Sequence, residues 1–240
     1  MKIGLVFPPM NNFKGLAEAI WSAHSFSHDL ITIIEPQWYD QVPLAKAWNN
    51  GALRAFSEGC DFALICNDDI MFAPETIDNM VVEYNKLRHS DNVIMVTPNN
   101  IRLQLAQPYD ILNYHCPSDP FTYSEHPNFS CFLIAPEFFT LCGTFDENFW
   151  PAWYEDNDMH RRAQLLGYKL IMTTAAPQVH MGGVSTAMIE NNPGSGQSQT
   201  YYVKKWGGLP SSHQVPDDLK EHFTHPYNDS ALTPREWIQE

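Results

Sequence analysis

Leu64-Ile65-Cys66-Asn67-Asp68-Asp69-Ile70 is the segment that indicates the fold most clearly. Its apolar first half predicts a buried strand, which ends at an amide and two carboxylates. In open α/β sheets, ligands bind beyond the carboxyl ends of the strands, so these acids stand where a ligand would bind. Hard divalent cations prefer oxygen ligands, and a nucleotide diphosphate needs such a cation to neutralise it. The segment therefore predicts a strand that presents a metal to a phosphorylated substrate; the alternative is an ordinary Asn-Asp-Asp turn.

Strands and helices alternate through the first hundred residues. Apolar, β-branched runs predict the strands, and apolar positions at helical spacing predict the helices between them. We expect strands over residues 3–7, 30–34, 61–69 and 93–96, and helices near residues 13–20, 44–57 and 74–87. An intervening helix favours parallel pairing of the two strands that flank it. The pattern predicts an α/β nucleotide-binding half.

The second part of the chain is less regular. Residues 97–127 lack clear periodicity and are too many for an idle connection, so we expect a functional excursion there. Further elements are predicted as a strand over 128–134, a helix over 136–141, a helix over 159–166 and a strand over 168–172. Residues 191–198 have the composition of a loop that could act as a lid. Residues 210–240 are expected to wrap the same domain.

Charge and cysteine content limit the possible partners. The chain has 240 residues, with 28 acidic against 14 basic side chains and a net charge of -14. This balance opposes nonspecific binding to nucleic acid, although a cluster of Arg161, Arg162, Lys204 and Lys205 would leave a nucleic-acid partner open. Five cysteines without C-x-x-C spacing are typical of reduced thiols. No apolar run approaches the roughly 18 residues of a membrane span, so we expect a cytoplasmic protein without a transmembrane segment.

Three further groups could carry chemistry. Glu155, Asp156 and Asp158 precede or open a helix, where capping explains one carboxylate but hardly three. His180 precedes two glycines, and a single histidine is more often structural than a ligand. Lys205 follows Lys204 among aromatic residues, which indicates either a solvated helix end or a point charge for a diphosphate.

The order of these motifs resembles the family 2 glycosyltransferases of the GT-A fold. The resemblance spans about residues 3–208 and rests on the ordered set Asn67-Asp68-Asp69, Phe-Asp-Glu-Asn-Phe at 145–149, Glu155-Asp156-x-Asp158, His180-x-Gly-Gly and Lys204-Lys205-Trp206-Gly207. It implies a single α/β domain with a mixed, mostly parallel sheet flanked by helices. Residues 1–208 would form this domain, with a nucleotide-sugar-binding half over 1–100, an acceptor and catalytic half over 101–183, and a tail over 209–240.

The resemblance also implies roles for individual residues. Asp69 and His180 match the ligands of Mn²⁺ or Mg²⁺, and Asp156 matches the general base. Trp153 and Glu155, beside it, are expected to bind the acceptor together with residues 97–127, because aromatic faces pack against sugars. The residues expected to contact the nucleotide donor are Pro8, Glu35, Asn49, Gly51, Asn67, Asp68 and Lys205, with Asn67 standing where the family has an acid.

The implied reaction is an inverting transfer of one sugar from a nucleoside-diphosphate sugar to an acceptor hydroxyl, by default on a glycan or a lipid-linked glycan. A nucleobase of DNA or a protein could also be the acceptor. A sugar-nucleotide pyrophosphorylase is a second class of enzyme, but residues 7–12, Phe-Pro-Pro-Met-Asn-Asn, lack its Gly-rich basic loop. A noncatalytic carbohydrate-binding relative is the third reading, disfavoured because Asp69, Asp156 and His180 are all present. The sequence leaves the oligomeric state open.

Overall fold

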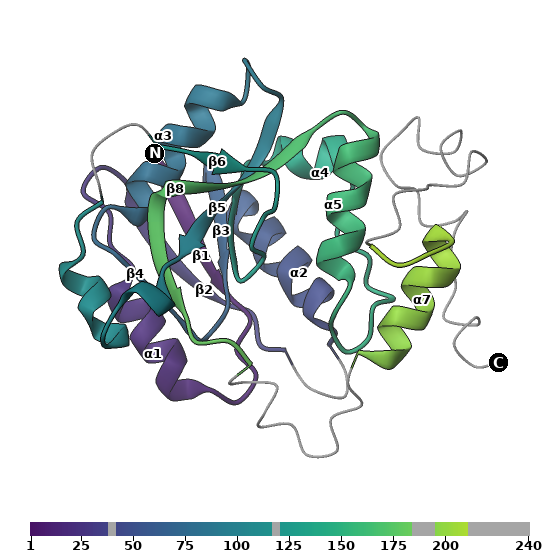
Figure 1. Ribbon diagram of the computed structural model, residues 1–240, viewed down its shortest axis with the longest axis horizontal. Coiled ribbons are helices and arrows are strands. Elements are labelled where there is room, and N and C mark those ends of the chain that lie inside the picture. The colour runs from purple at the N-terminus through teal and green to yellow at the C-terminus, as the bar shows by residue number, and fades with distance from the viewer. Residues whose placement is uncertain (38–41, 117–120, 184–194, 211–240) are drawn as a thin grey trace.

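The computed structural model describes residues 1–37, 42–116, 121–183 and 195–210, and its centre is one eight-stranded sheet flanked by helices (Figure 1). The strands are β1 (Lys2–Phe7), β2 (Asp29–Ile34), β3 (Phe62–Cys66), β4 (Ile70–Phe72), β5 (Val93–Asn100), β6 (Tyr123–Ser124), β7 (Cys131–Ile134) and β8 (Lys169–His180). The α-helices are α1 (Phe13–Ser22), α2 (Leu44–Ser57), α3 (Thr76–Leu87), α4 (Glu137–Cys142), α5 (Glu155–Leu165) and α7 (Gly196–Trp206). Two short 3-10 helices are η1 (Arg102–Gln104) and η2 (Pro108–Asn113).

The sheet is mixed, with most strands parallel. The strand order is β2-β1-β3-β7-β5-β8-β4, and β6 pairs with β8 outside this path. Strands β1, β2, β3, β5 and β8 run in one direction, whereas β4, β6 and β7 run in the other. This arrangement confirms the α/β class and the mixed, mostly parallel sheet expected from the sequence.

Helices cover both faces of the sheet and form a separate core on each. On one face, α1 and α3 pack against the strands through residues such as Leu16 and Met80. On the other, α2, α4 and α5 contribute Trp48, Phe138 and Met159. All five residues of β3 are buried, because its alternate side chains point into the two cores. A strand covered on both faces is apolar throughout, which explains the continuous apolar run of residues 62–66.

The structure corrects several predicted boundaries. Strand β5 continues to Asn100, and β8 continues to His180 rather than ending near residue 172. Its second half, Thr-Thr-Ala-Ala-Pro-Gln-Val, contains polar residues and a proline, so the sequence pattern did not predict a strand there. The register of the β5–β8 pairing also shifts where this half begins. The short strand β4 was not predicted. Residues 97–127 contain the end of β5, both 3-10 helices and β6.

Other expectations fall partly or wholly beyond the described residues. The loop predicted over 191–198 ends earlier, because α7 begins at Gly196. The proposed lid function of residues 184–194 and the wrapping of the tail over 211–240 lie outside the part of the chain that the structure describes. All five cysteines are free thiols. Within the described residues, no helix is long and apolar enough to cross a membrane.

Gly51 allows helix α2 to lie close to β1, and this contact can be tested. A Cβ atom added at Gly51 would lie 2.1 Å from Cγ1 of Val6, a fully buried and β-branched residue that cannot move aside. We expect Gly51→Ala to lower the free energy of unfolding by about 1–3 kcal/mol through overpacking, despite the better helix propensity of alanine.

Gly196→Ala is the matched control, because the added Cβ would have no atom within 4 Å. Urea unfolding of both variants measures the difference. An unfolding midpoint of Gly51→Ala equal to that of the control would contradict the packing argument.

Candidate active site

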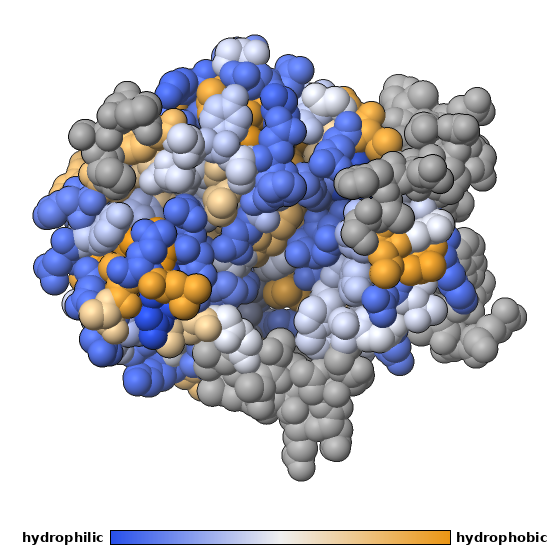
Figure 2. Space-filling model, viewed as in Figure 1, coloured by the Kyte–Doolittle hydropathy of each residue, from blue (hydrophilic) through white to orange (hydrophobic). Residues whose placement is uncertain are grey.

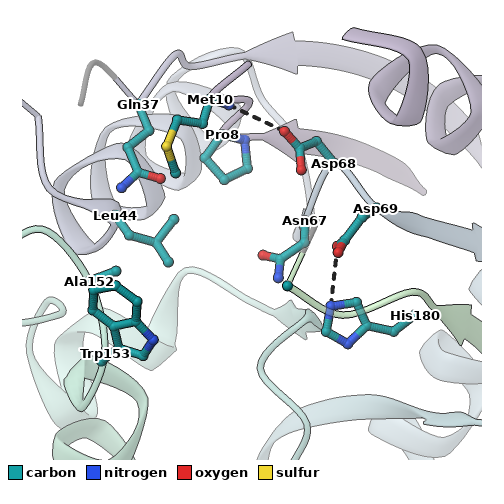
Figure 3. Close-up of a pocket in the computed structure, with 11 residues that line it drawn as sticks. Pro8, Met10, Gln37, Leu44, Asn67, Asp68, Asp69, Ala152, Trp153 and His180 are labelled. Atoms are coloured by element: carbon teal, nitrogen blue, oxygen red, sulfur yellow. Dashed lines mark hydrogen bonds and ion pairs between the residues drawn. The ribbon is translucent and has the colours of Figure 1, made fainter. Parts of the chain in front are cut away.

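A carboxylate and an imidazole from distant parts of the chain meet at one edge of the sheet. Asp69 lies between β3 and β4, and its Oδ1 is 3.1 Å from Nε2 of His180, at the end of β8 (Figure 3). The antiparallel pairing of β4 with β8 places His180 opposite Ile70. The amide of Met181 also donates to the carbonyl of Asp69 at 3.0 Å, which holds the two segments together. The predicted pair of metal ligands is therefore adjacent in space.

This pair offers a divalent cation one oxygen and one nitrogen. Among the described residues, no group of three or more His, Cys, Asp or Glu side chains is placed to hold a metal ion. A cation bound by Asp69 and His180 would need the rest of its coordination shell from water and from a ligand. Diphosphate oxygens are ligands of the required kind. The donor set thus fits a metal that binds together with its substrate rather than a closed structural site.

Asp68 connects this motif to the turn that follows β1. Its Oδ2 accepts from the amide of Met10 at 3.2 Å, and its carbonyl accepts from Nδ2 of Asn12 at 2.8 Å. Asn12 in turn caps α1 by accepting from the amide of Gly15. A Cβ at Gly15 would lie 2.2 Å from the Asp68 carbonyl, so only glycine fits there. These contacts fix the position of the metal motif relative to the turn.

A cavity of about 230 Å³, here called the first cavity, lies in front of these residues. Figure 3 shows Met10 and Gln37 on one side of it and Asp69 and His180 on another. Leu44 and Trp153 lie across the cavity from Asp69 and His180. Its lining consists of Pro8, Met10, Gln37, Leu44, Asn67, Asp68, Asp69, Ala152, Trp153, His180 and Gly183. The sequence pointed to Pro8, Asn67, Asp68, Asp69, Trp153 and His180. It missed Met10, Gln37 and Leu44, which have no distinctive motif.

Three predicted donor contacts lie elsewhere. Asn49 is buried and exchanges two hydrogen bonds of 2.9 Å with the backbone of Phe145, so it fastens α2 to the 145–149 segment. Gly51 packs against Val6, as described above. Glu35 accepts from Asn50 at 3.3 Å. None of the three lines the first cavity. For Asn49 and Gly51 the reason is that both face inward from α2, toward the core.

The buried position of Lys205 contradicts its predicted role as a diphosphate contact. Its side chain is fully buried, with Nζ 2.6 Å from Asp146 Oδ2 and 2.7 Å from Asp158 Oδ1. Arg162 is also fully buried and bound to Asp158. Because these two cations point into the protein, they do not join Arg161 and Lys204 in a basic surface patch. The expectation that the four could attract nucleic acid loses its structural basis.

A second cavity of about 640 Å³ lies beside the first and is lined by Glu155 and Asp156 of α5. Both cavities are lined by Leu44, Asn67, Ala152 and Trp153, and the second also by Tyr154, Glu155, Asp156, Asn157, Ser195, Leu209 and Pro210. Figure 2 shows a mostly hydrophilic face that is hollowed near its centre, between the elements labelled β8 and α5 in Figure 1. Asp156 and the Asp69–His180 pair thus lie at two adjacent cavities, and Trp153 lines both.

The chain enters α5 through two strained residues. Trp153 and Tyr154 have φ angles of 73° and 67°, in the left-handed region that bulky side chains rarely adopt. Each such residue costs on the order of 1–3 kcal/mol and persists only when its surroundings hold it. Here the turn places Trp153 where it lines both cavities and starts the helix directly at Glu155.

Glu155 and Asp156 are adjacent acids in different environments. Asp156 is half-buried, and its Oδ1 accepts from both the backbone amide and Nδ2 of Asn157, at 2.7 and 2.8 Å. Burial raises its pKa, and these hydrogen bonds only partly offset the rise. Burial, and then the charge of Asp156, raise the pKa of Glu155 well above its ordinary value. Its Oε2 is buried without a hydrogen-bond partner. A raised pKa makes the Asp156 carboxylate a stronger base.

Comparison with known proteins gives distant relatives. No family model matches the chain. A galactofuranosyl glycosyltransferase of Leishmania donovani is 24% identical over 178 residues, covering 59% of this chain and 41% of the relative. The chain therefore spans under half the length of that protein.

Solved structures show which fold this is. GalNAc-T7 with UDP, GalNAc and Mn²⁺ is similar over 100% of this chain and 56% of its own, with 12% identity and a TM-score of 0.60. A mutant of Drosophila beta-1,4-galactosyltransferase 7 with manganese, UDP-Gal and xylobiose covers 96% of this chain and 82% of its own, with 15% identity and a TM-score of 0.52. S. aureus TarS covers 93% and 69%, with 10% identity and a TM-score of 0.53. The chain has the GT-A fold of glycosyltransferases, as the motif order indicated.

The buried Glu155 predicts a pH-dependent stability. Because its pKa is raised from 4.5 by folding, the folded protein binds more protons than the unfolded chain above pH 4.5. The free energy of unfolding therefore falls as the pH rises from 4.5 toward the raised pKa. We expect Glu155→Gln to match the wild type near pH 4 and to exceed it at pH 7, with a gap that grows by up to about 1.4 kcal/mol per pH unit. Urea unfolding across this range measures it, and a pH-independent gap would refute the assignment.

Proposed function

We propose that this protein is a metal-dependent, inverting glycosyltransferase that moves one sugar from a nucleoside-diphosphate sugar to an acceptor hydroxyl. The observation that carries the proposal is that two cavities share four lining residues, and that one holds the Asp69–His180 pair and the other Asp156. If the donor diphosphate lies at the Asp69–His180 pair and the acceptor lies at Asp156, the transferred sugar would lie between them. The GT-A fold and the glycosyltransferase relative support the same reaction class.

The proposed donor site is the first cavity. Asp69 and His180 would hold Mn²⁺ or Mg²⁺, and the cation would neutralise the diphosphate and the charge that develops on it as it leaves. Pro8, Met10 and Gln37 would lie along the nucleoside, since they line the side of the cavity away from His180. Two structural neighbours contain UDP or UDP-Gal together with manganese. UDP-sugars, and among them galactose, N-acetylgalactosamine and galactofuranose donors, are therefore the first to test.

The proposed acceptor site is the second cavity. Asp156 would accept the proton of the acceptor hydroxyl as that oxygen attacks the anomeric carbon from the face opposite the leaving diphosphate. Such a single displacement inverts the anomeric centre. Trp153 and Tyr154 would provide aromatic surface for a sugar ring, and Glu155 lines the same space. A glycan acceptor is favoured, and one structural neighbour was solved with xylobiose.

The other candidate functions have weaker support. A nucleic-acid acceptor conflicts with the net charge of -14 and with the burial of Arg162 and Lys205. A pyrophosphorylase would not need a carboxylate such as Asp156 on the acceptor side. A noncatalytic binding protein would not need the Asp69–His180 pair. An assay of sugar transfer to glycan acceptors, run with each UDP-sugar and Mn²⁺, tests the proposal directly. Donor binding without turnover for every acceptor would favour the noncatalytic alternative.

Removing a metal ligand should weaken donor binding. We expect Asp69→Asn to lower Mn²⁺-dependent UDP affinity by at least about tenfold. Mutation of a residue that only hydrogen-bonds to a metal ligand already lowers metal affinity by about this factor. EDTA should abolish wild-type transfer. Isothermal titration with UDP, with and without Mn²⁺, measures the effect. Asp29→Asn, the same chemical change at an exposed position at the start of β2, is the control. Full transfer in excess EDTA would exclude the metal.

Removing the proposed base should act on turnover instead. Asp156→Asn keeps the shape of the side chain but removes its basicity. We expect kcat to fall roughly 10²-fold or more, with donor affinity nearly unchanged. Steady-state kinetics at saturating donor and acceptor, together with UDP titration, separate the two effects. Near wild-type turnover would move the base to Glu155, because Asp158 is already bound to Arg162 and Lys205.

A further inference from the structure

Helix α7 is bound to the rest of the protein through buried charges. It lies beside α5 (Figure 1), and its residues Tyr201 and Tyr202 pack against Phe149, with Trp206 against Tyr202. Lys205 of the same helix forms ion pairs with Asp146 in the 145–149 segment and with Asp158 in the first turn of α5. All three side chains of this bridge are fully buried.

The two carboxylates have further donors around them. Asp158 also accepts from Nε of Arg162 and from Nε1 of Trp206, each at 2.9 Å. Asp146 also accepts from the hydroxyl of Tyr201 at 2.8 Å and from Asn148. Burial alone would raise the pKa of Asp146, but the Lys205 ammonium outweighs it and lowers the pKa to about 2. Two cations therefore face two anions, a balance that low-dielectric surroundings require.

A second attachment lies at the other end of α7. The hydroxyl of Ser198 hydrogen-bonds to the carbonyls of Trp150 and Ala152, at 3.0 and 2.8 Å. The strained pair Trp153 and Tyr154 comes immediately after this attachment, and Asp156 and Asp158 follow in the first turn of α5. Helix α7 thus contacts the chain on both sides of the segment that carries the Trp153 ring and the proposed base.

We propose that Lys205 is a positioning residue for Asp156. The inference rests on the glycosyltransferase function proposed above. The Lys205–Asp158 contact fixes the first turn of α5, while Ser198 fixes the preceding loop, so that the unfavourable left-handed pair between them has no freedom to relax. Without the bridge, the turn relaxes and the Asp156 carboxylate moves away from the acceptor. Because a misplacement of about 1 Å can cost 10²-fold in rate, this bridge controls turnover without touching the substrate.

The test compares Lys205→Met with the charge-matched double variant Lys205→Met/Asp146→Asn. The single change leaves a carboxylate buried without its cation and lowers stability as well. The double change removes one charge of each sign and leaves Asp158 bound to Arg162, so it keeps the protein folded. Lys204→Met, the same change at an exposed position of α7, is the control. Circular dichroism gives the folded fraction by which every rate is corrected.

In the double variant we expect kcat to fall about 10- to 100-fold while the UDP dissociation constant stays within about twofold of wild type. Hydrogen exchange of the amides of residues 153–158 should speed up, and that of β1 and β3 should not. A loss of donor affinity equal to the loss of kcat would assign Lys205 to general stability and overturn the proposal. So would wild-type kcat with unchanged exchange. The exchange measurement needs no turnover, so absence of transfer by the wild type would refute the proposed function alone.

Discussion

The antiparallel pairing of β4 with β8 is the contact on which the site depends. Strand β4 has only three residues, Ile70–Phe72, yet it directly follows Asp69 and pairs with the last three residues of β8. Because side chains alternate along a strand, a shift of one residue in this pairing would turn His180 to the other face of the sheet. The same β8 strand pairs with β5 and β6, so the imidazole is attached to the most extensively paired strand of the sheet. Strand pairing therefore holds Asp69 and His180 rigidly in the sheet.

The two halves of the site are joined by contacts around residues 145–151. The carbonyl of Pro151 accepts from the amide of Leu44 at 3.0 Å and from Nε2 of Gln37 at 3.3 Å. Asn49 binds the backbone of Phe145 from the same side. These bonds tie α2 and the segment after β2 to the loop that leads into α5. Asn49, which the motif comparison assigned to the donor, thus helps to set the separation between the Asp69–His180 pair and Asp156.

Sequence reasoning succeeded where a residue pattern has one structural meaning. The buried run before Asn67 forms a central strand, and Asp69 and His180, which the motif order grouped, lie 3.1 Å apart. It failed where the same residue type serves two purposes. A lysine beside aromatic rings can bind a diphosphate or fill a buried charge network, and only the position of Asp146 and Asp158 decides between them. The lining residues Met10, Gln37 and Leu44 could not be found, because a cavity wall made by separate segments leaves no local pattern.

The three acids at the start of α5 illustrate how surroundings assign roles to similar groups. They lie within four consecutive positions, yet Asp158 is bound to two cations, Glu155 is buried with one oxygen unpaired, and Asp156 remains half-buried at the cavity. Asp158 is closed to solvent and bound to both Arg162 and Lys205, which suits a structural anchor. Burial raises the pKa of Glu155 well above its ordinary value, which disfavours the charged form of this side chain. Asp156 combines partial exposure at the cavity with a raised pKa, and these two properties suit the proton removal proposed above. The surroundings thus distinguish three neighbouring carboxylates, and for Asp158 they include Lys205 and Trp206 of α7, which is distant in the sequence.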